Sequence, residues 1–530
     1  MKKTIALLLA LVMAFALVAC GGKQPSGEQP GGNTDPGTSA PADPGTPSKP
    51  AEPVKTDETL VVMLDAEPEK LYGDAGASGI IIIDAIAASL LEYDAETRGW
   101  TWGLAESYEK IDDTHYKFTL REGIQYADGT PVTAADAVYS LGYMNAQGTS
   151  DAQYFNMEEM EVIDDRTFVF ALTQYIPGWE FFLAEHNGVV YSQAAVDAVG
   201  GEEAALRNIP VGCGKYQLKE WKSGEYILIE RNENYYDKDY IGYYKYIKFM
   251  FVGDSASRLL AVKSGDAQVA YRISAAEYNS LKSDPAVTGL AYDAGVVYNV
   301  YFNNESGPCA DVKVREALCY AIDGAAVNAV INMNAGTVAQ GWLPASFPHY
   351  KDYGLIEYNP EKAKQMLADA GYPNGIDLYC CVIASHREMA TVVQESMRQA
   401  GVNLTVEVLE QNVYLQKARG GEYDIQMGNN TVPSLTPNVF NQIDPGKVGK
   451  SVQSCRIKAP EVSDYIKMCN SSDEATSAEG WEKLTDYVFG NYCLKGLCDG
   501  DKYNAVAAGL TGLSYATRMS YIDVTNIRPQ

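Results

Sequence analysis

Residues Phe118 to Ser140 read FTLREGIQYADGTPVTAADAVYS and place the end of a strand, a turn and a helix start in that order. The tetrapeptide Asp128-Gly129-Thr130-Pro131 supplies residues that favour a turn. Thr133 and Asp136 then match a variant of the capping box, so a helix is predicted over residues 134 to about 145. Any strand-turn-helix unit would use similar residue types, but their joint order is far more specific.

Helix and strand signals alternate along much of the remaining chain. Asn359 can cap a helix that begins with Pro360, and Gly371 suits its end. From Val402 to Val408, apolar and polar side chains alternate as in a half-buried strand. This alternation of elements is typical of the α/β class. Further strands are predicted at Leu60–Leu64, Tyr116–Leu120 and Gln268–Tyr271, helices at Leu259–Lys263 (ended by Gly265) and Val393–Gln399 (ended by Gly401), and a core segment of either type at Ile80–Ile83.

The chain begins like an exported protein. Lys2 and Lys3 precede an apolar run from Ile5 to Val18, which is too short to remain as a comfortable membrane span. The residues before Cys20 resemble a bacterial lipobox, which implies cleavage before this cysteine and acylation of its thiol. An ordinary cleavage site with an incidental cysteine is the alternative.

The segment after Cys20 has the composition of a tether. From Gly21 to about Val54 it contains no apolar residue larger than Ala before that valine, so it cannot form a core. Roughly 475 residues then remain, enough for two or three domains. The net charge of −27 disfavours binding to nucleic acid or to anionic headgroups.

Cysteine and histidine patterns give little sign of metal or catalytic chemistry. Nine cysteines follow Cys20, and an odd number cannot all pair, which suggests free thiols or a reducing habitat. Their spacing does not match zinc knuckles, so buried small side chains are favoured over metal ligands. The four histidines are scattered, and Ser514 lies in a sequence that lacks the second glycine of a nucleophile elbow. We therefore expect neither an enzyme nor a cofactor or metal site.

The stretch Phe118–Ser140 closely resembles the signature of extracytoplasmic solute-binding proteins of the oligopeptide, dipeptide and nickel class, family 5, the receptor subunits of ABC importers. The resemblance covers nearly all of the chain from about Thr56, and as a set its motifs are highly specific. The further similarities, in the family's order, are Pro210–Leu218 followed by Trp221, Arg231–Tyr236, Asn299–Asn303, Asp311–Leu318 with Ala321-Ile322-Asp323, Asn359–Gly371 and Gly401–Asp424.

The resemblance implies an α/β fold of the type II, cluster C periplasmic-binding-protein kind, in which two lobes close on a ligand. An extra subdomain would be inserted in lobe I at about residues 100–208. The division that we expect is a signal peptide (1–19), a lipidated cysteine and tether (20–55), lobe I (56–295), lobe II (296–498) and a C-terminal return to lobe I (499–530).

One departure from the family pattern bears on the ligand. In peptide-binding members, an acidic residue after the strand matching Tyr423–Met427 commonly pairs with the amino group of the ligand. Here the segment Gly428–Pro437 reads GNNTVPSLTP and contains no acid. Such a loop can hydrogen-bond an amine but cannot neutralise its charge, which puts tight binding of a free peptide amino terminus in doubt.

Candidate ligand contacts follow from the same comparison. Small residues around Ser78, in the predicted loop Gly76–Gly79, would allow close approach of a ligand, although any surface turn contains such residues. Arg387, in a predicted loop, could pair with a ligand carboxylate or could equally be solvated, and each aromatic candidate could simply pack within a lobe. The full set is Ser78, the aromatic residues Trp179, Tyr301 and Trp342, and Arg387, Asn429 and Asn430.

The leading hypothesis is a receptor that captures oligopeptides or dipeptides and delivers them to a permease and its ATPase, working as a monomer. The same fold binding a sugar, a modified amino acid or a metal chelate is the first alternative. A surface hydrolase or adhesin is the second, and it requires an acid, base or nucleophile constellation in the cleft. The lipid on Cys20 would hold the protein on the outer face of the cytoplasmic membrane, as suits a Gram-positive-type envelope.

Overall fold

The computed structural model describes residues 56–73, 75–148, 151–207, 211–240, 242–431, 437–450, 452–516 and 521–530. Its largest element is a ten-stranded mixed sheet. Across this sheet the strands follow the order β14 (Val402–Leu409), β13 (Ile376–Ile383), β15 (Ile425–Thr431), β12 (Val287–Phe302), β16 (Leu494–Ala507), β11 (Val269–Ile273), β1 (Thr56–Leu64), β10 (Tyr244–Phe251), β9 (Tyr226–Arg231) and β8 (Tyr216–Lys222).

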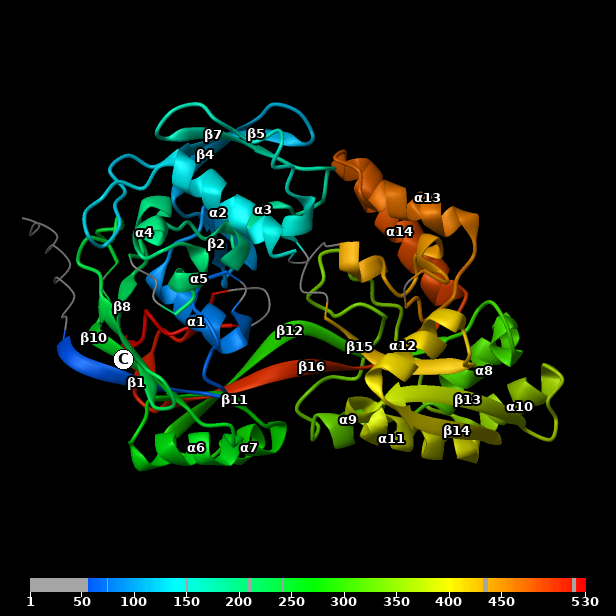
Figure 1. Cartoon of the computed structure of the whole chain (residues 1–530). Coiled ribbons are helices and arrows are strands. Elements are labelled where there is room, and N and C mark those ends of the chain that lie inside the picture. Colours follow the sequence, from blue (N-terminus) through cyan, green and yellow to red (C-terminus); the bar gives the residue numbers. More distant parts are fainter. Residues whose placement is uncertain are drawn as a thin grey trace, which may run out of the picture. The chain divides into compact units, whose positions relative to one another are not determined.

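Two long strands run through the middle of the sheet. β12 and β16 lie side by side and antiparallel, from the pair Val287–Ala507 to the pair Tyr301–Leu494 (Figure 1). Their register shifts between Asp293 and Val296, where Gly295 adopts a positive φ of 65° that suits glycine. On one side of this irregularity β16 also pairs with β11, and on the other side β12 also pairs with β15. Each of the two long strands therefore runs through both halves of the sheet, and the two halves contain different neighbouring strands.

A smaller four-stranded sheet contains the strand at the start of the segment Phe118–Ser140. It comprises β4 (Ala105–Lys110), β5 (His115–Leu120), β7 (Thr167–Ala171) and β6 (Glu161–Val162). The predicted helix is α2 (Ala134–Ala146), and its capping box is formed. The backbone N–H of Asp136 donates to Thr133 Oγ1 at 3.2 Å, and the backbone N–H of Thr133 donates to Asp136 Oδ2 at 3.0 Å. This prediction is confirmed.

The remaining elements cover the sheets. The other helices are α1 (Gly76–Ile86), α3 (Glu180–Leu183), α4 (Gln193–Ala198), α5 (Glu202–Ala205), α6 (Ser255–Ser264), α7 (Ala275–Ser280), α8 (Val312–Ala321), α9 (Gly324–Ile331), α10 (Pro360–Asp369), α11 (Arg387–Gln399), α12 (Gln411–Gly420), α13 (Pro460–Cys469) and α14 (Glu474–Gly490). The short strands are β2 (Leu91–Asp94), β3 (Gly99–Trp102), β17 (Leu510–Thr511), β18 (Ser514–Tyr515), β19 (Ile522–Asp523) and β20 (Arg528–Pro529).

The buried apolar side chains form separate clusters. The largest joins α1, the small sheet and β8–β10 with the C-terminal residues Ile522, Val524 and Ile527. A second includes Val300 and Phe302 together with side chains of α8 and α11. A third gathers Tyr301 with residues of the segments 342–347 and 439–494. Because Val300 and Tyr301 belong to different clusters, the half of the sheet that contains β12, β13 and β15 is covered on both faces.

Most of the local predictions are confirmed, and the cysteines behave as expected. α6 ends at Gly265, whose φ is 84°, and α10 starts at Pro360 with Asn359 as its cap. β14 spans the alternating stretch from Val402. All nine cysteines after Cys20 are buried and free. Since burial raises the pKa of thiols such as Cys213, to about 12, these side chains serve as small apolar residues.

Three local predictions are wrong. Ser78 lies in the first turn of α1 and not in a loop, because the helix containing Ile80–Ile83 extends back to Gly76 without a capping side chain. Arg387 begins α11, which follows directly after a short 3-10 turn. β15 continues through Asn430 to Thr431, since it pairs with β12 over that whole length. All three errors concern candidate ligand contacts, and the last places Asn429 and Asn430 on a strand.

The expected signal peptide and tether, including Cys20, lie outside the described residues. None of the described helices is both long and apolar enough to span a bilayer.

Candidate functional site

One face of the sheet beside the irregularity of β12 is unusually polar. Residues two apart on a strand point to the same face, so Asn299 and Tyr301 share a face that excludes Val300. On the neighbouring β15, Gln426 is paired with Tyr301 and Asn430 with Val297. Paired residues also share a face. We call Asn299, Tyr301, Gln426 and Asn430 the polar row.

Each member of the polar row keeps a buried polar atom without a hydrogen-bond partner in the protein. The four atoms are Asn299 Oδ1, Tyr301 Oη, Gln426 Oε1 and Asn430 Nδ2. The side chains of Asn299 and Gln426 are fully buried, and Asn430 is only 8% exposed. Burying a polar group without a partner costs on the order of 1–3 kcal/mol, so four such atoms on one face are costly for the protein alone.

Two of the predicted aromatic residues lie together. Tyr301 and Trp342 belong to the same buried cluster, and the indole Nε1 of Trp342 also lacks a partner. Burial raises the pKa of the Tyr301 hydroxyl, an effect that the neighbouring Asn299 side chain partly offsets. Tyr301 therefore stays neutral and can both donate and accept a hydrogen bond.

The edge of this face is formed where β13 and β15 end. Nε2 of His386 and Oδ1 of Asn429 lie 3.3 Å apart. A Cβ at Gly428 would stand 3.6 Å from the Tyr301 ring and 3.8 Å from the His386 ring, so the glycine leaves room between them. Burial lowers the pKa of His386 and favours its neutral form. Arg387 follows and is exposed.

The two candidates from the first half of the chain lie elsewhere. Ser78 Oγ donates to Asp65 Oδ1 at 2.8 Å, and Asp65 Oδ2 accepts from Arg272 at 3.1 Å, at the end of β1. Trp179 is 2% exposed and packs against Tyr116, with ring centroids 4.1 Å apart, in the core of the small sheet. Trp179 thus packs within a lobe, which was the alternative interpretation for each aromatic candidate. We leave it out of the proposed site.

Three carboxylates on the two long strands were not predicted as site residues. Asp293 on β12 is paired directly with Asp501 on β16, and Asp499 is paired with Val297. Asp499 Oδ2 accepts from Thr337 Oγ1 at 3.2 Å, whereas Oδ1 is buried without a partner. Burial raises the pKa of Asp499 to about 6. The spacing of Asp499 and Asp501 was the available signal, because two acids at alternate positions of a buried strand share one face.

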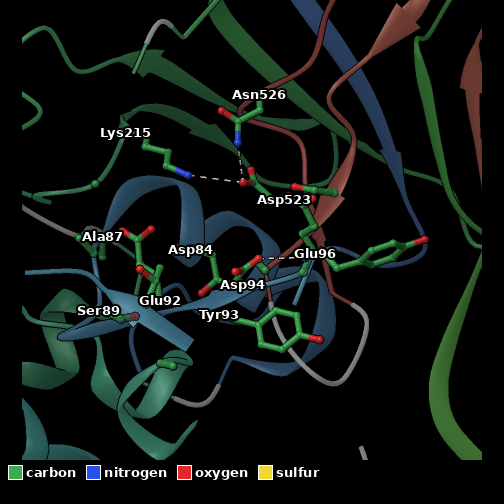
Figure 2. A pocket seen from close by; sticks show the side chains of 18 of the residues that line it. Asp84, Ala87, Ser89, Glu92, Tyr93, Asp94, Glu96, Lys215, Asp523 and Asn526 are labelled. Carbon is green, nitrogen blue, oxygen red and sulfur yellow. Dashed lines mark hydrogen bonds and ion pairs between the residues drawn. The ribbon is translucent and has the colours of Figure 1, made fainter. Parts of the chain in front are cut away.

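A cavity of about 390 Å³ lies apart from this face, between α1, β2 and the C-terminal segment. Lys215 Nζ is 3.4 Å from Asp523 Oδ2, which also accepts from Asn526 Nδ2 at 3.1 Å (Figure 2). Burial opposes the charge on Lys215, but Asp523 and Glu92 raise its pKa. The ion pair therefore joins the glycine-rich segment before β8 to the C-terminal residues.

Comparison with known proteins decides the family. A model described as "Bacterial extracellular solute-binding proteins, family 5 Middle" matches residues 100–449. The chain belongs to this family.

Relatives and structures agree with that assignment. The glutathione-binding protein GsiB of Escherichia coli K12 is 28% identical over 314 residues, which are 58% of this chain and 60% of that protein. Heme-binding protein A of Haemophilus influenzae is 30% identical over 358 residues, 60% of this chain and 64% of the relative. In each case the chain matches less than two thirds of the relative's length.

Solved structures of the family establish the fold. HbpA2 from Haemophilus parasuis superposes on 89% of this chain with a TM-score of 0.81 at 21% identity, and all of that chain is covered. NikA from Brucella suis, in complex with Fe(III)-EDTA, gives a TM-score of 0.75 at 17% identity over 89% of this chain and all of its own. The family member described here therefore has the two-lobe type II periplasmic-binding-protein fold that the sequence resemblance implied.

Proposed function

We propose that this protein is the extracytoplasmic receptor of an ABC importer and that it captures oligopeptides or dipeptides between its two lobes. The observation that carries the proposal is the polar row, whose four buried polar atoms have no partner in the protein. Asn299 and Gln426 offer acceptors and Asn430 offers a donor, as a peptide backbone requires, since it presents N–H and C=O groups in alternation.

Several named relatives and neighbours favour a peptide ligand. The probable D,D-dipeptide-binding protein DdpA of Escherichia coli K12 is 26% identical over 346 residues. Structures with similar folds include a dipeptide-binding protein in complex with Met-Leu and DppA from Helicobacter pylori in complex with the peptide STSA. A buried face with unpaired donors and acceptors is consistent with such ligands.

A non-peptide ligand is the alternative, and one observation favours it. The segment Gly428–Pro437 has no acid for an amino terminus. Neighbours in the same fold carry agropinic acid or Fe(III)-EDTA. For the present chain we propose binding without turnover, because its relatives are binding proteins of transport systems.

The proposed arrangement in the cell follows from the sequence. Residues 56–295 with 499–530 would act as lobe I and 296–498 as lobe II, with closure driven by contacts of the ligand to both. Cys20, after removal of residues 1–19, would carry a lipid, and the segment up to residue 55 would be a tether. The receptor would work as a monomer beside its permease on the outer face of the membrane.

A thermal-shift screen with the full chain tests the ligand class. Peptides, sugars and metal chelates are added separately, and a ligand present at about 100 times its Kd stabilises the folded state by about 2.7 kcal/mol. We expect stabilisation by short peptides and its loss in the variant Asn430→Ala. Stabilisation by sugars or chelates alone would refute the peptide proposal, and turnover of a stabilising ligand would point to a hydrolase instead.

A further inference from the structure

The two long strands concentrate negative charge next to the polar row. Asp293 and Asp501 stand directly opposite each other on neighbouring strands. Asp499 lies on the same strand as Asp501, two residues earlier. Alternate positions of a strand share a face, so Asp499 and Asp501 point to the same side of the sheet. Like charges at paired positions are unfavourable, and the arrangement therefore calls for a compensating positive charge.

The protein itself supplies little of that charge. Arg98 Nη1 lies 3.3 Å from Asp293 Oδ2, but neither Asp499 nor Asp501 forms an ion pair with any other described residue. Asp499 Oδ1 is buried and accepts no hydrogen bond. A carboxylate oxygen withdrawn from water without a partner is expensive, so a cation from outside the protein would relieve that cost.

A second buried polar group without a partner lies on the same face. Asn430 on β15 and Asp499 on β16 are both paired with Val297 on β12, so the two side chains share a face and flank one residue. The Asn430 side chain is 8% exposed, and its Nδ2 has no acceptor. Strands two places apart in a sheet are separated by about 10 Å. That span suits a ligand which gives an ammonium group to Asp499 and a nearby carbonyl oxygen to Asn430.

We propose that Asp499 forms the subsite for a positively charged amino group of the ligand, with Asp293 and Asp501 adding to the negative field. This inference rests on the proposed binding site and narrows its ligand to primary amines that carry a neighbouring oxygen acceptor. The acid that the segment Gly428–Pro437 lacks is thus provided by β16, from the strand that joins both halves of the sheet.

The test compares ligands that differ only in the charge of the amino group. One library of tripeptides with free amino termini and the same library after N-acetylation are each incubated with the full chain, and retained members are identified by native mass spectrometry. Glucosamine and N-acetylglucosamine form a second pair, measured by calorimetry. We expect members with a free amine to bind at least about 30-fold more tightly than their acetylated partners, as for a buried charge pair.

Variants assign the effect to one carboxylate. Asp499→Asn keeps the shape of the side chain and should abolish the preference for the free amine, whereas Asp464→Asn, on the exposed side of α13, should leave it unchanged. Thr337→Val removes only the hydrogen bond to Asp499 Oδ2 and should reduce the preference without abolishing it. If Asp499→Asn is poorly folded in thermal unfolding, Thr337→Val decides the question.

The outcomes separate this inference from the proposed function. Equal binding of free and acetylated tripeptides overturns the amino subsite but leaves peptide binding intact. Preference for glucosamine without any peptide binding supports the subsite and refutes the peptide ligand. An undiminished amine preference in Asp499→Asn, or no binding by any member of either pair, overturns the subsite.

Discussion

Asn430 and Asp499 face the same side of the sheet because both are paired with Val297, and each keeps a buried polar atom without a partner in the protein. One offers a donor and the other a negatively charged acceptor. Polar groups that lack hydrogen-bond partners in the unliganded protein reduce the stability of its fold, but they are available to bind a ligand.

Asp499→Asn should stabilise the unliganded protein while weakening ligand binding. Burial raises the pKa of Asp499 to about 6, above its ordinary value, so the folded state disfavours the carboxylate. Its contribution to stability is present at pH 4 and is lost as the pH rises through 6. At pH 7.5 we expect the variant to gain about 1 kcal/mol in free energy of unfolding, allowing for partial exposure. Urea unfolding at pH 4 and 7.5 measures this, and an equal effect at both values contradicts it.

Affinity for an amine ligand should fall at acidic pH. The ammonium group needs ionised Asp499, so below pH 6 binding should weaken by up to about tenfold per pH unit. Asp293 and Asp501 are the other groups whose negative charges act on Asp499, and the pKa of Asp501 is also raised by burial. Calorimetry between pH 5 and 8 should show this slope in the native protein and a nearly flat profile for Asp499→Asn.

Tyr301→Phe should mainly weaken ligand binding, whereas Tyr216→Phe should mainly lower the stability of the fold. Tyr301 Oη has no partner, so Tyr301→Phe should change the free energy of unfolding by less than about 0.5 kcal/mol but weaken ligand binding about fivefold or more. Tyr216 Oη donates to the Tyr244 carbonyl at 2.8 Å, so Tyr216→Phe should cost about 1 kcal/mol and leave affinity unchanged. Denaturant unfolding and ligand titration of both variants make the comparison. Similar losses of stability in the two would speak against a free hydroxyl at Tyr301.

Lys215→Met should destabilise the protein by about 3 kcal/mol, because it leaves Asp523 buried without its cation. The side chains of this pair are only 19% and 15% exposed. Lys467→Met is the matched control, since Lys467 pairs with Asp464 on the surface at 78% and 69% exposure and should matter little. Urea unfolding at pH 7 compares the two, and a cost below about 1 kcal/mol for Lys215→Met would show that the ion pair is not needed.

Cys20→Ala should release the protein from the membrane. The thiol is the group that would be acylated, and the segment that follows has no apolar surface to hold a bilayer. Fractionation of cells expressing the variant, with Cys213→Ala as a control for loss of a cysteine, should show it in the medium or the soluble fraction. Retention of Cys20→Ala with the membrane after residues 1–19 have been removed would refute the lipid anchor.

The sequence predicted local elements well where a few adjacent residues determine them. The capping box of Thr133 and the glycine end of α6 depend on contacts within one or two turns, and both are present. The start of α1 at Gly76 was missed because no capping side chain marks it. The extent of β15 was missed for a different reason, since that strand is defined by pairing with β12, far away in the chain.

The residues of the candidate site also divide into those that the sequence indicated and those that it did not. Tyr301 and Trp342 were selected from the sequence as aromatic candidates and Asn430 from the segment that departs from the family pattern, and each has a buried polar atom without a partner. Asn299 and Gln426 were not selected, because nothing adjacent to them in the sequence reveals which residues they oppose. Asp499 was missed although its spacing from Asp501 was an available signal.

The sequence by itself determined the α/β class, the family and the capped and glycine-ended helices, because these are encoded in short, ordered runs of residues. Only the tertiary structure decided that positions 297, 430 and 499 form one line across three strands. Strand pairing of this kind depends on which segments exclude water together, and the cost of an unpaired buried donor or carboxylate appears only once that burial is known.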